Sequence, residues 1–210
     1  STPPVLSIGG LPQNYAMYAQ RLMSLNLPVV RPEDSVGKVL RLMDEYKVCH
    51  LALVNGEVFA GLMYEEDLME RDEETPLAAM EARPVSVEPQ LHLYDVVSRL
   101  VESEVDAMPV VHVGKFLGCI EPKAVLRFLA ESTHWAGLGA VLVLEVPKND
   151  LSIAEIARLV EGADAKVIAC TTSQKDDSSN VEVTLKLNTQ DVEPVISTFQ
   201  RFGYSIQTFY

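Results

Sequence analysis

Two stretches of the chain carry the same pattern of hydrophobic positions without a gap. The pattern pairs Pro32 with Pro89 and Gly61 with Gly118, a displacement of 57 residues. The same shift matches apolar positions between these landmarks: Val39 with Val96, Val48 with Val105, Val54 with Val111 and Phe59 with Phe116. Because one repeat unit usually cannot bury its apolar face alone, we expect two copies packed as a pseudo-symmetric pair. Small ligands tend to bind in clefts at such interfaces.

The duplicated pattern predicts the same order of elements in each copy. In the first copy, a brief strand at 29–30 precedes a helix whose apolar residues recur every three or four positions. Asn55-Gly56 predicts a hairpin, because both residues tolerate positive φ, and a short helix begins near Glu65. The other predicted ranges are strands 51–54 and 58–63 in the first copy, and strands 85–87, 108–111 and 115–120 with helices 93–100 and 122–131 in the second.

The last third of the chain carries a different pattern. Alternating apolar residues over 181–187 predict a half-buried strand. Ser152 and Glu155 form a capping-box pattern at the start of a helix. Pro194 is tolerated only in a first turn and so places the start of a second helix near Asp191. The order is βαββαβ, the ferredoxin-like arrangement, with the other strands at 140–146, 166–172 and 204–210.

Composition narrows the class of protein further. The chain has 210 residues with 48% hydrophobic residues, which is enough for a sizeable core. Its net charge of −13 opposes nucleic acid and anionic membranes as partners, because both need a basic face. Cys49, Cys119 and Cys170 are far apart and odd in number, which predicts reduced thiols in a cytoplasmic protein. No apolar run is long enough to cross a bilayer.

The duplicated unit resembles a tandem pair of CBS domains, also called a Bateman module. The resemblance rests on the strand, Pro32, helix and hairpin, followed by the run from Gly61 to Asp67. CBS repeats typically end with glycine, two apolar residues, serine or threonine, two variable residues and aspartate. The tail resembles an ACT or ACT-like domain. The whole chain is similar to the CBS–CBS–ACT proteins associated with acetoin utilisation.

The resemblance implies an α+β fold, in which a tandem CBS pair precedes a ferredoxin-like, ACT-type domain. We expect four segments along the chain. Residues 1–23 form a lead-in that is flexible or left from expression. The first CBS repeat spans 24–75, the second spans 76–133, and the ACT-like domain spans 138–210.

The family also implies an adenosine-containing ligand between the repeats. Asp67 occupies the position that grips ribose hydroxyls, where a carboxylate accepts two hydrogen bonds at once. Tyr64 stands where serine or threonine meets phosphate, and His50 stands at the mouth of the cleft. In the second repeat, Glu121 and Ala124 occupy the positions of Tyr64 and Asp67, so the second site is expected to be degenerate. The alternative for Asp67 is a plain capping residue.

Backbone groups near Val30, Arg31 and Leu51 are expected to frame the adenine, with Arg31 as the nearest cation. Candidate ligands are AMP, ATP and S-adenosylmethionine. The net charge of −13 opposes a triphosphate, so AMP or a neutral adenosyl compound should bind better than ATP unless Mg²⁺ assists.

No residue constellation predicts catalysis. The acidic residues over 65–74 lack the ordered spacing and turn glycine of a calcium loop, and the four histidines lack the ligand spacing of a zinc site. The chain has no nucleophile elbow and no phosphate-binding P-loop. We therefore expect no catalytic residue, no metal site and no required cofactor.

Three hypotheses about function follow. The first is a non-enzymatic sensor that binds an adenine nucleotide or adenosyl compound and signals to a regulated enzyme, still unidentified, or to its own oligomer. The second is a constitutive homodimeric scaffold or accessory subunit whose sites are degenerate. The third is amino-acid sensing through the ACT-like domain. A homodimer is expected in each case, because apolar helix faces remain after the two repeats pair.

Overall fold

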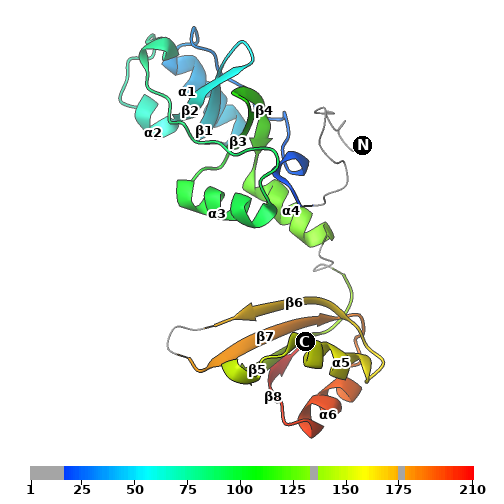
Figure 1. Cartoon of the computed structure of the whole chain (residues 1–210). Helices are drawn as coiled ribbons and strands as arrows, with labels where there is room; N and C mark the ends of the chain where they lie inside the picture. The colour runs from blue at the N-terminus through cyan, green and yellow to red at the C-terminus, as the bar shows by residue number, and fades with distance from the viewer. Residues whose placement is uncertain (1–16, 133–136, 175–177) are drawn as a thin grey trace. The chain divides into compact units, whose positions relative to one another are not determined.

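The computed structural model describes residues 17–132, 137–174 and 178–210. The chain divides into two compact units at Arg127 and Phe128 (Figure 1). Most of the expected lead-in, residues 1–16, lies outside the described residues, as do residues 133–136, between the second expected repeat and the expected ACT-like domain. The rest of the lead-in joins the first unit. Ala19 is fully buried, and its N–H donates to the carbonyl of Leu91.

The first unit contains the predicted long helices and hairpins of both repeats, but the brief strands predicted at 29–30 and 85–87 are only single bridges, at Val30 and Val87. Ser35 caps the first long helix by accepting a hydrogen bond from the N–H of Lys38, and Gly56 turns the first hairpin with φ of 62°. The elements are η1 (Ala19–Arg21), α1 (Val36–Tyr46), β1 (His50–Asn55), β2 (Val58–Tyr64), α2 (Glu65–Leu68), η2 (Leu77–Ala79), α3 (Leu93–Ser103), β3 (Met108–His112), β4 (Lys115–Ile120) and α4 (Pro122–Ser132), whose last turns belong to the second unit.

The two repeats share one sheet with strand order β1-β2-β4-β3. They join at the hairpin ends, where Val58 pairs with Lys115, its own equivalent under the 57-residue shift. The N–H of Phe59 donates to the carbonyl of Gly114 at 2.9 Å. The equivalent bond runs from Phe116 to Glu57 at 3.0 Å. The shift therefore maps each hydrogen bond onto the other, as a pseudo-twofold axis requires.

A segment of each repeat also pairs with a strand of the other repeat. Arg83, near the start of the second repeat, pairs with Leu62 of β2 in the first repeat through bonds of 2.8 and 3.0 Å. Ser24, at the start of the first repeat, pairs with Cys119 of β4 in the second through bonds of 2.8 and 2.9 Å. The repeats are therefore interlocked by these exchanged segments.

The duplicated glycines make this exchange possible. A Cβ on Gly61 would lie 2.5 Å from the Cβ of Ala82, and a Cβ on Gly118 would lie 2.7 Å from the carbonyl oxygen of Ser24. Both glycines have positive φ, 143° and 155°. The glycine in each repeat thus allows the segment from the other repeat to approach the strand closely.

Buried apolar side chains pack within the first repeat and also between the two repeats. One cluster packs α1 against β1 and β2 within the first repeat and includes Val30, Val39, Met43, Leu51 and Met63. The other lies between the repeats, where Ala52 and Val54 meet Ala107 and Cys119, with Phe59 and Phe116 packed against them. The second cluster buries the apolar surface that neither repeat could cover alone.

The second unit has the predicted βαββαβ order. Its strands form an antiparallel sheet in the order β6-β7-β5-β8, and Figure 1 shows both helices together on one face. The core lies between these helices and the sheet, with Phe199 and Leu144 fully buried. The predicted α+β fold class is confirmed. The elements are β5 (Val141–Pro147), η3 (Lys148–Asp150), α5 (Ile153–Glu161), β6 (Val167–Ser173), β7 (Asn180–Leu187), α6 (Glu193–Arg201) and β8 (Ser205–Phe209).

Candidate functional site

Asp67 lies in α2, a single helical turn that begins directly after β2. Its carboxylate accepts two hydrogen bonds from the guanidinium of Arg83, at 3.1 Å from Nε and 2.8 Å from Nη2. The same Nη2 also donates to Glu66 at 2.8 Å. These bonds to Asp67 and Glu66 raise the pKa of Arg83. Asp67 keeps 37% of its side-chain surface exposed, so it can still accept hydrogen bonds from a ligand.

Tyr64 places an aromatic face beneath this ion pair. The guanidinium carbon of Arg83 lies 3.8 Å from the centre of the Tyr64 ring, within the range of a cation–π contact. The His50 ring packs edge-on against the Tyr64 ring, with the ring centres 4.4 Å apart. Burial raises the pKa of the Tyr64 hydroxyl, although the positive charge of Arg83 opposes the shift. The hydroxyl therefore stays protonated near neutral pH and can donate a hydrogen bond.

Asp106 brings the second repeat into this site. Its Oδ1 lies 2.7 Å from Nδ1 of His50, and its Oδ2 accepts a 2.6 Å hydrogen bond from the N–H of Cys49. Cys49 and Asp106 are equivalent positions of the two repeats, so the pseudo-twofold axis passes between them. A continuous set of contacts thus runs from Asp106 through His50, Tyr64 and Arg83 to Asp67. We call these five residues the Asp67 site.

The predicted site residues fall into two groups. The structure brings His50, Tyr64 and Asp67 together, but Val30 and Leu51 lie in the core of the first repeat with at most 1% exposed surface. The N–H of Val30 is also used, because it donates to the carbonyl of Ala52. Their side chains therefore cannot contact a ligand at the Asp67 site, and the predicted contact of nearby backbone groups with an adenine stays a prediction.

Arg31 is also absent from the Asp67 site. Its Nη1 donates to the carbonyls of Val54 and Gly56, at the hairpin end of β1. His50 begins the same strand. At about 3.3 Å per residue, Val54 lies roughly 13 Å along the strand from His50. Arg83, and not Arg31, is the cation that contacts Asp67.

Sequence reasoning missed Arg83 and Asp106 for different reasons. Asp106 carried a usable signal, because the 57-residue shift makes it the equivalent of Cys49, and equivalent positions meet at a pseudo-twofold axis. Arg83 carried no such signal. Its place beside Asp67 depends on the segment exchange, which pairs the start of the second repeat with β2.

The equivalent position in the second repeat lacks this chemistry. Ala124 stands where Asp67 stands, and Glu121 stands where Tyr64 stands. The Glu121 carboxylate is mostly buried and pairs with Lys123 at 3.2 Å. A carboxylate at this point repels phosphate, and alanine accepts no hydrogen bond from a hydroxyl. The two halves of the first unit are therefore chemically unequal.

The contact between the repeats through Asp106 should depend on pH. Burial raises the pKa of the Asp106 carboxyl, but hydrogen bonds from His50 and the N–H of Cys49 outweigh it and lower the pKa. The contact therefore stabilises the fold above about pH 3.9, the ordinary aspartate value, and this contribution is lost as the pH falls further. We expect Asp106→Asn to cost about 1 kcal/mol at pH 7, since solvent partly screens the group. Denaturant unfolding at pH 7 and pH 3 measures the difference, which should shrink at pH 3.

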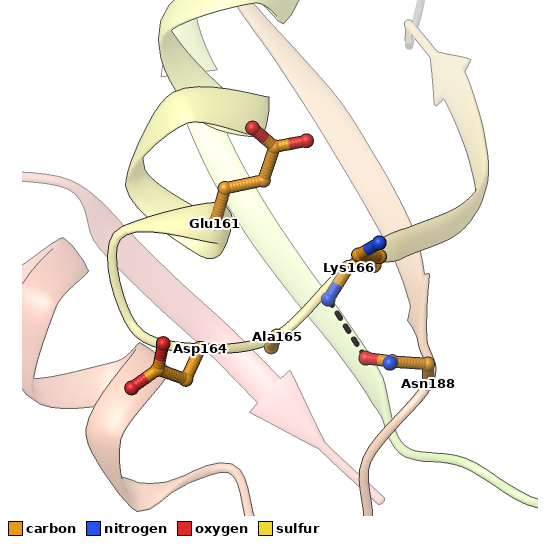
Figure 2. A pocket seen from close by; sticks show the side chains of 5 residues that line it. All are labelled: Glu161, Asp164, Ala165, Lys166 and Asn188. Carbon is orange, nitrogen blue, oxygen red and sulfur yellow. Dashed lines mark hydrogen bonds between the residues drawn. The ribbon is translucent and has the colours of Figure 1, made fainter.

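The second unit contains a cavity of about 370 Å³ at the end of α5 (Figure 2). Glu161, Asp164, Lys166 and Asn188 supply its polar lining. The backbone N–H of Lys166 donates to Oδ1 of Asn188 at 2.7 Å. Figure 2 shows the carboxylates of Glu161 and Asp164 pointing in different directions. These groups do not converge on one point, so the cavity does not favour a bound amino acid.

Two pseudo-symmetric repeats that share a sheet and exchange segments define a class of paired α/β modules. A family model for the CBS domain matches residues 19–74 and 77–131, more than half of the chain. The chain therefore belongs to the CBS-domain family, with two CBS domains in tandem followed by a ferredoxin-like unit.

The chain is also similar to solved structures. A CBS domain pair/ACT domain protein from Thermotoga maritima is 18% identical over 55% of this chain and 98% of that chain, with a TM-score of 0.50. A Vibrio cholerae protein assigned to acetoin utilization is 18% identical over 55% of this chain and 92% of that chain, with a TM-score of 0.48. CBSX2, solved in complex with AMP, is 26% identical over 50% of this chain and 90% of that chain, with a TM-score of 0.44. The predicted resemblance to CBS–CBS–ACT proteins is confirmed.

Over residues 17–132, 137–174 and 178–210, none of the helices combines the length and the apolar character that a membrane-spanning segment needs. Over the same residues, no group of three or more histidine, cysteine, aspartate or glutamate side chains could hold a metal ion.

Proposed function

We propose that this protein is a non-enzymatic sensor that binds an adenosyl compound at the Asp67 site. One observation carries the proposal. Asp67, the family's ribose-binding position, keeps an exposed carboxylate beside a cation and an aromatic face, at a point where both repeats meet. Membership of the CBS-domain family supports the class of ligand, and the unequal halves of the module support one site per chain.

The charges at the site favour a ligand with little negative charge. Arg83 keeps 42% of its side-chain surface exposed and can meet one phosphate. Glu66 and Asp106 lie close by and oppose further phosphates. We therefore propose AMP or S-adenosylmethionine before ATP, in agreement with the net charge of −13.

Arg83 also offers a route for the signal. Its segment pairs with β2 through Leu62 and reaches β3 a few residues later, where Val87 pairs with Val110. A ligand that accepts hydrogen bonds from Arg83 must draw its guanidinium away from Asp67. Such a movement acts on a segment that both repeats hold, so we propose that it changes the packing of the repeats. In this proposal a homodimer partner or a regulated enzyme detects the change.

The scaffold hypothesis remains the second candidate, and one observation favours it. Arg83 already occupies two acceptor positions of Asp67 and covers the ring of Tyr64. If no adenosyl compound displaces Arg83, the ion pair between Arg83 and Asp67 only stabilises the packing of the two repeats. The two candidates predict opposite outcomes in a binding experiment.

Calorimetry with AMP, S-adenosylmethionine and ATP tests the proposal directly. We expect one site per chain. Asp67→Asn should weaken binding of AMP by about 1.5–3 kcal/mol, because a charged acceptor for two hydroxyls is lost. Glu66→Gln is the matched comparison: it removes a carboxylate that bonds the same nitrogen of Arg83 and competes with the phosphate, so it should not weaken the binding of AMP. At about 100 times its dissociation constant, the ligand should stabilise the fold by roughly 2.7 kcal/mol.

Two outcomes contradict the sensor. Equal binding of AMP to Asp67→Asn and the parent would place the ligand elsewhere. No binding of any of the three compounds would leave the scaffold as the better account.

A further inference from the structure

A second cavity, of about 320 Å³, lies at the hairpin end of the first unit. Both repeats line it. Val29, Arg31 and Glu57 come from the first repeat, and Lys115 and Phe116 come from the second. Its volume is at the lower end of the range for small-molecule pockets. None of the five residues of the Asp67 site lines it, and Arg31 lies at the other end of β1 from His50.

Arg31 is held in place with part of its guanidinium unused. Its Nη1 donates to the carbonyls of Val54 at 3.0 Å and Gly56 at 2.7 Å, and its own N–H donates to Asp34. Both side-chain bonds use one nitrogen. Within the described part of the chain, Nε and Nη2 make no hydrogen bond, which leaves two of the three nitrogens of the planar guanidinium unused. This edge matches a carboxylate, which accepts two parallel hydrogen bonds.

Lys115 supplies the second positive charge. Its ammonium pairs with Glu57 at 2.8 Å, and the two side chains are 64% and 78% exposed. An ion pair this exposed contributes little to stability, so Lys115 can exchange Glu57 for another anion. The cavity therefore offers one fixed and one mobile cation beside the apolar surfaces of Val29 and Phe116.

The fold does not require these cations. Under the 57-residue shift, Glu88 is the equivalent of Arg31 and Val58 is the equivalent of Lys115. The second hairpin forms with a carboxylate at the first of these positions, where Glu88 lies 3.2 Å from His112. If Arg31 served only to hold the hairpin together, the second hairpin would be expected to carry an equivalent cation. Arg31 is present in only one of the two repeats of an acidic chain, which indicates that it binds an anion.

We propose that this cavity binds a small organic anion with a carboxylate head and an apolar body. The carboxylate takes Nε and Nη2 of Arg31 and draws Lys115 from Glu57, and the apolar body lies against Val29 and Phe116. Because the ligand touches both repeats, it holds their hairpin ends together. This site does not depend on the adenosyl site proposed above.

Amide NMR titration of the full chain tests this site with hydrocinnamate as the probe. Hydrocinnamyl alcohol has the same apolar body without the charge and serves as the matched ligand. We expect hydrocinnamate to shift the amide signals of Gly56 and Phe116, and the alcohol to bind at least tenfold more weakly. Arg31→Gln should weaken hydrocinnamate about tenfold or more, as expected for lost hydrogen bonds to a charged group.

Two surface variants keep the test decisive if Arg31→Gln unfolds. Lys115→Gln should weaken hydrocinnamate severalfold, and Glu57→Gln should strengthen it, because a competing carboxylate is removed. Lys47→Gln is the control, since Lys47 forms an equally exposed pair with Asp44, also at 2.8 Å, outside the cavity. Equal binding of the acid and the alcohol, or no change in affinity for the Lys115 and Glu57 variants, would overturn the proposal. Binding of AMP should persist in every variant.

Discussion

A Gly118→Ala variant will lose about 3 kcal/mol of unfolding free energy. The added Cβ would lie 2.7 Å from the carbonyl oxygen of Ser24. That oxygen cannot retreat freely, because it accepts the N–H of Cys119 at 2.9 Å. Backbone strain adds to the collision, since φ of 155° is a conformation that residues with a Cβ rarely adopt. Strain and overpacking each cost about 1–3 kcal/mol.

Gly114→Ala separates these two causes. Gly114 has φ of 76°, but a Cβ there would meet no atom within 4 Å. Its substitution should cost only about 1–2 kcal/mol, the penalty of the left-handed conformation. Chemical denaturation of both variants gives the comparison. Equal losses would show that the exchanged segment moves aside without cost.

Phe199→Ala should strongly destabilise the second unit and leave the stability of the first unit unchanged. Phe199 is fully buried in α6, with the ring of Tyr204 packed against it at 5.2 Å between ring centres. Removing a buried phenylalanine costs about 3–5 kcal/mol. A domain has a total stability of only about 5–15 kcal/mol, and small ones lie at the lower end. We therefore expect two separate thermal transitions, with only the one from the second unit shifted down.

Phe202→Ala is the matched control for this variant. Phe202 follows the same helix but is 50% exposed, so its removal leaves no cavity and should cost well under 1 kcal/mol. The Phe199→Ala chain should still bind AMP at the Asp67 site. A single transition that shifts as a whole would mean that the two units unfold together.

Local chemistry made most of the fold predictable. Asn55-Gly56 tolerates the turn that joins β1 to β2, and the hydroxyl of Ser152 caps α5 by accepting the N–H of Glu155. Each of these signals acts within a few residues, so no knowledge of distant contacts was needed. The 57-residue shift added the one long-range inference, that two copies share a core.

The candidate site was predicted only in part, because it depends on contacts between distant segments. Tyr64 and Asp67 lie in one short run, so the family pattern could locate both. Val30 and Leu51 were predicted to contribute nearby backbone groups, and their apolar side chains pack in the core of the first repeat. Arg83 reaches Asp67 because two segments cross between the repeats, which no periodicity in the chain encodes.

The exchange of segments also sets the order of events during protein synthesis. The stretch around Ser24 leaves the ribosome early, but its partner Cys119 is made only near the end of the second repeat. Until then, β4 does not exist, and the apolar residues that will face it remain exposed. Closing so long a loop costs little more entropy than closing a shorter one, but it delays the first unit until most of it has been translated. A nascent chain that stalls between the repeats would present open strand edges to chaperones and to other nascent chains.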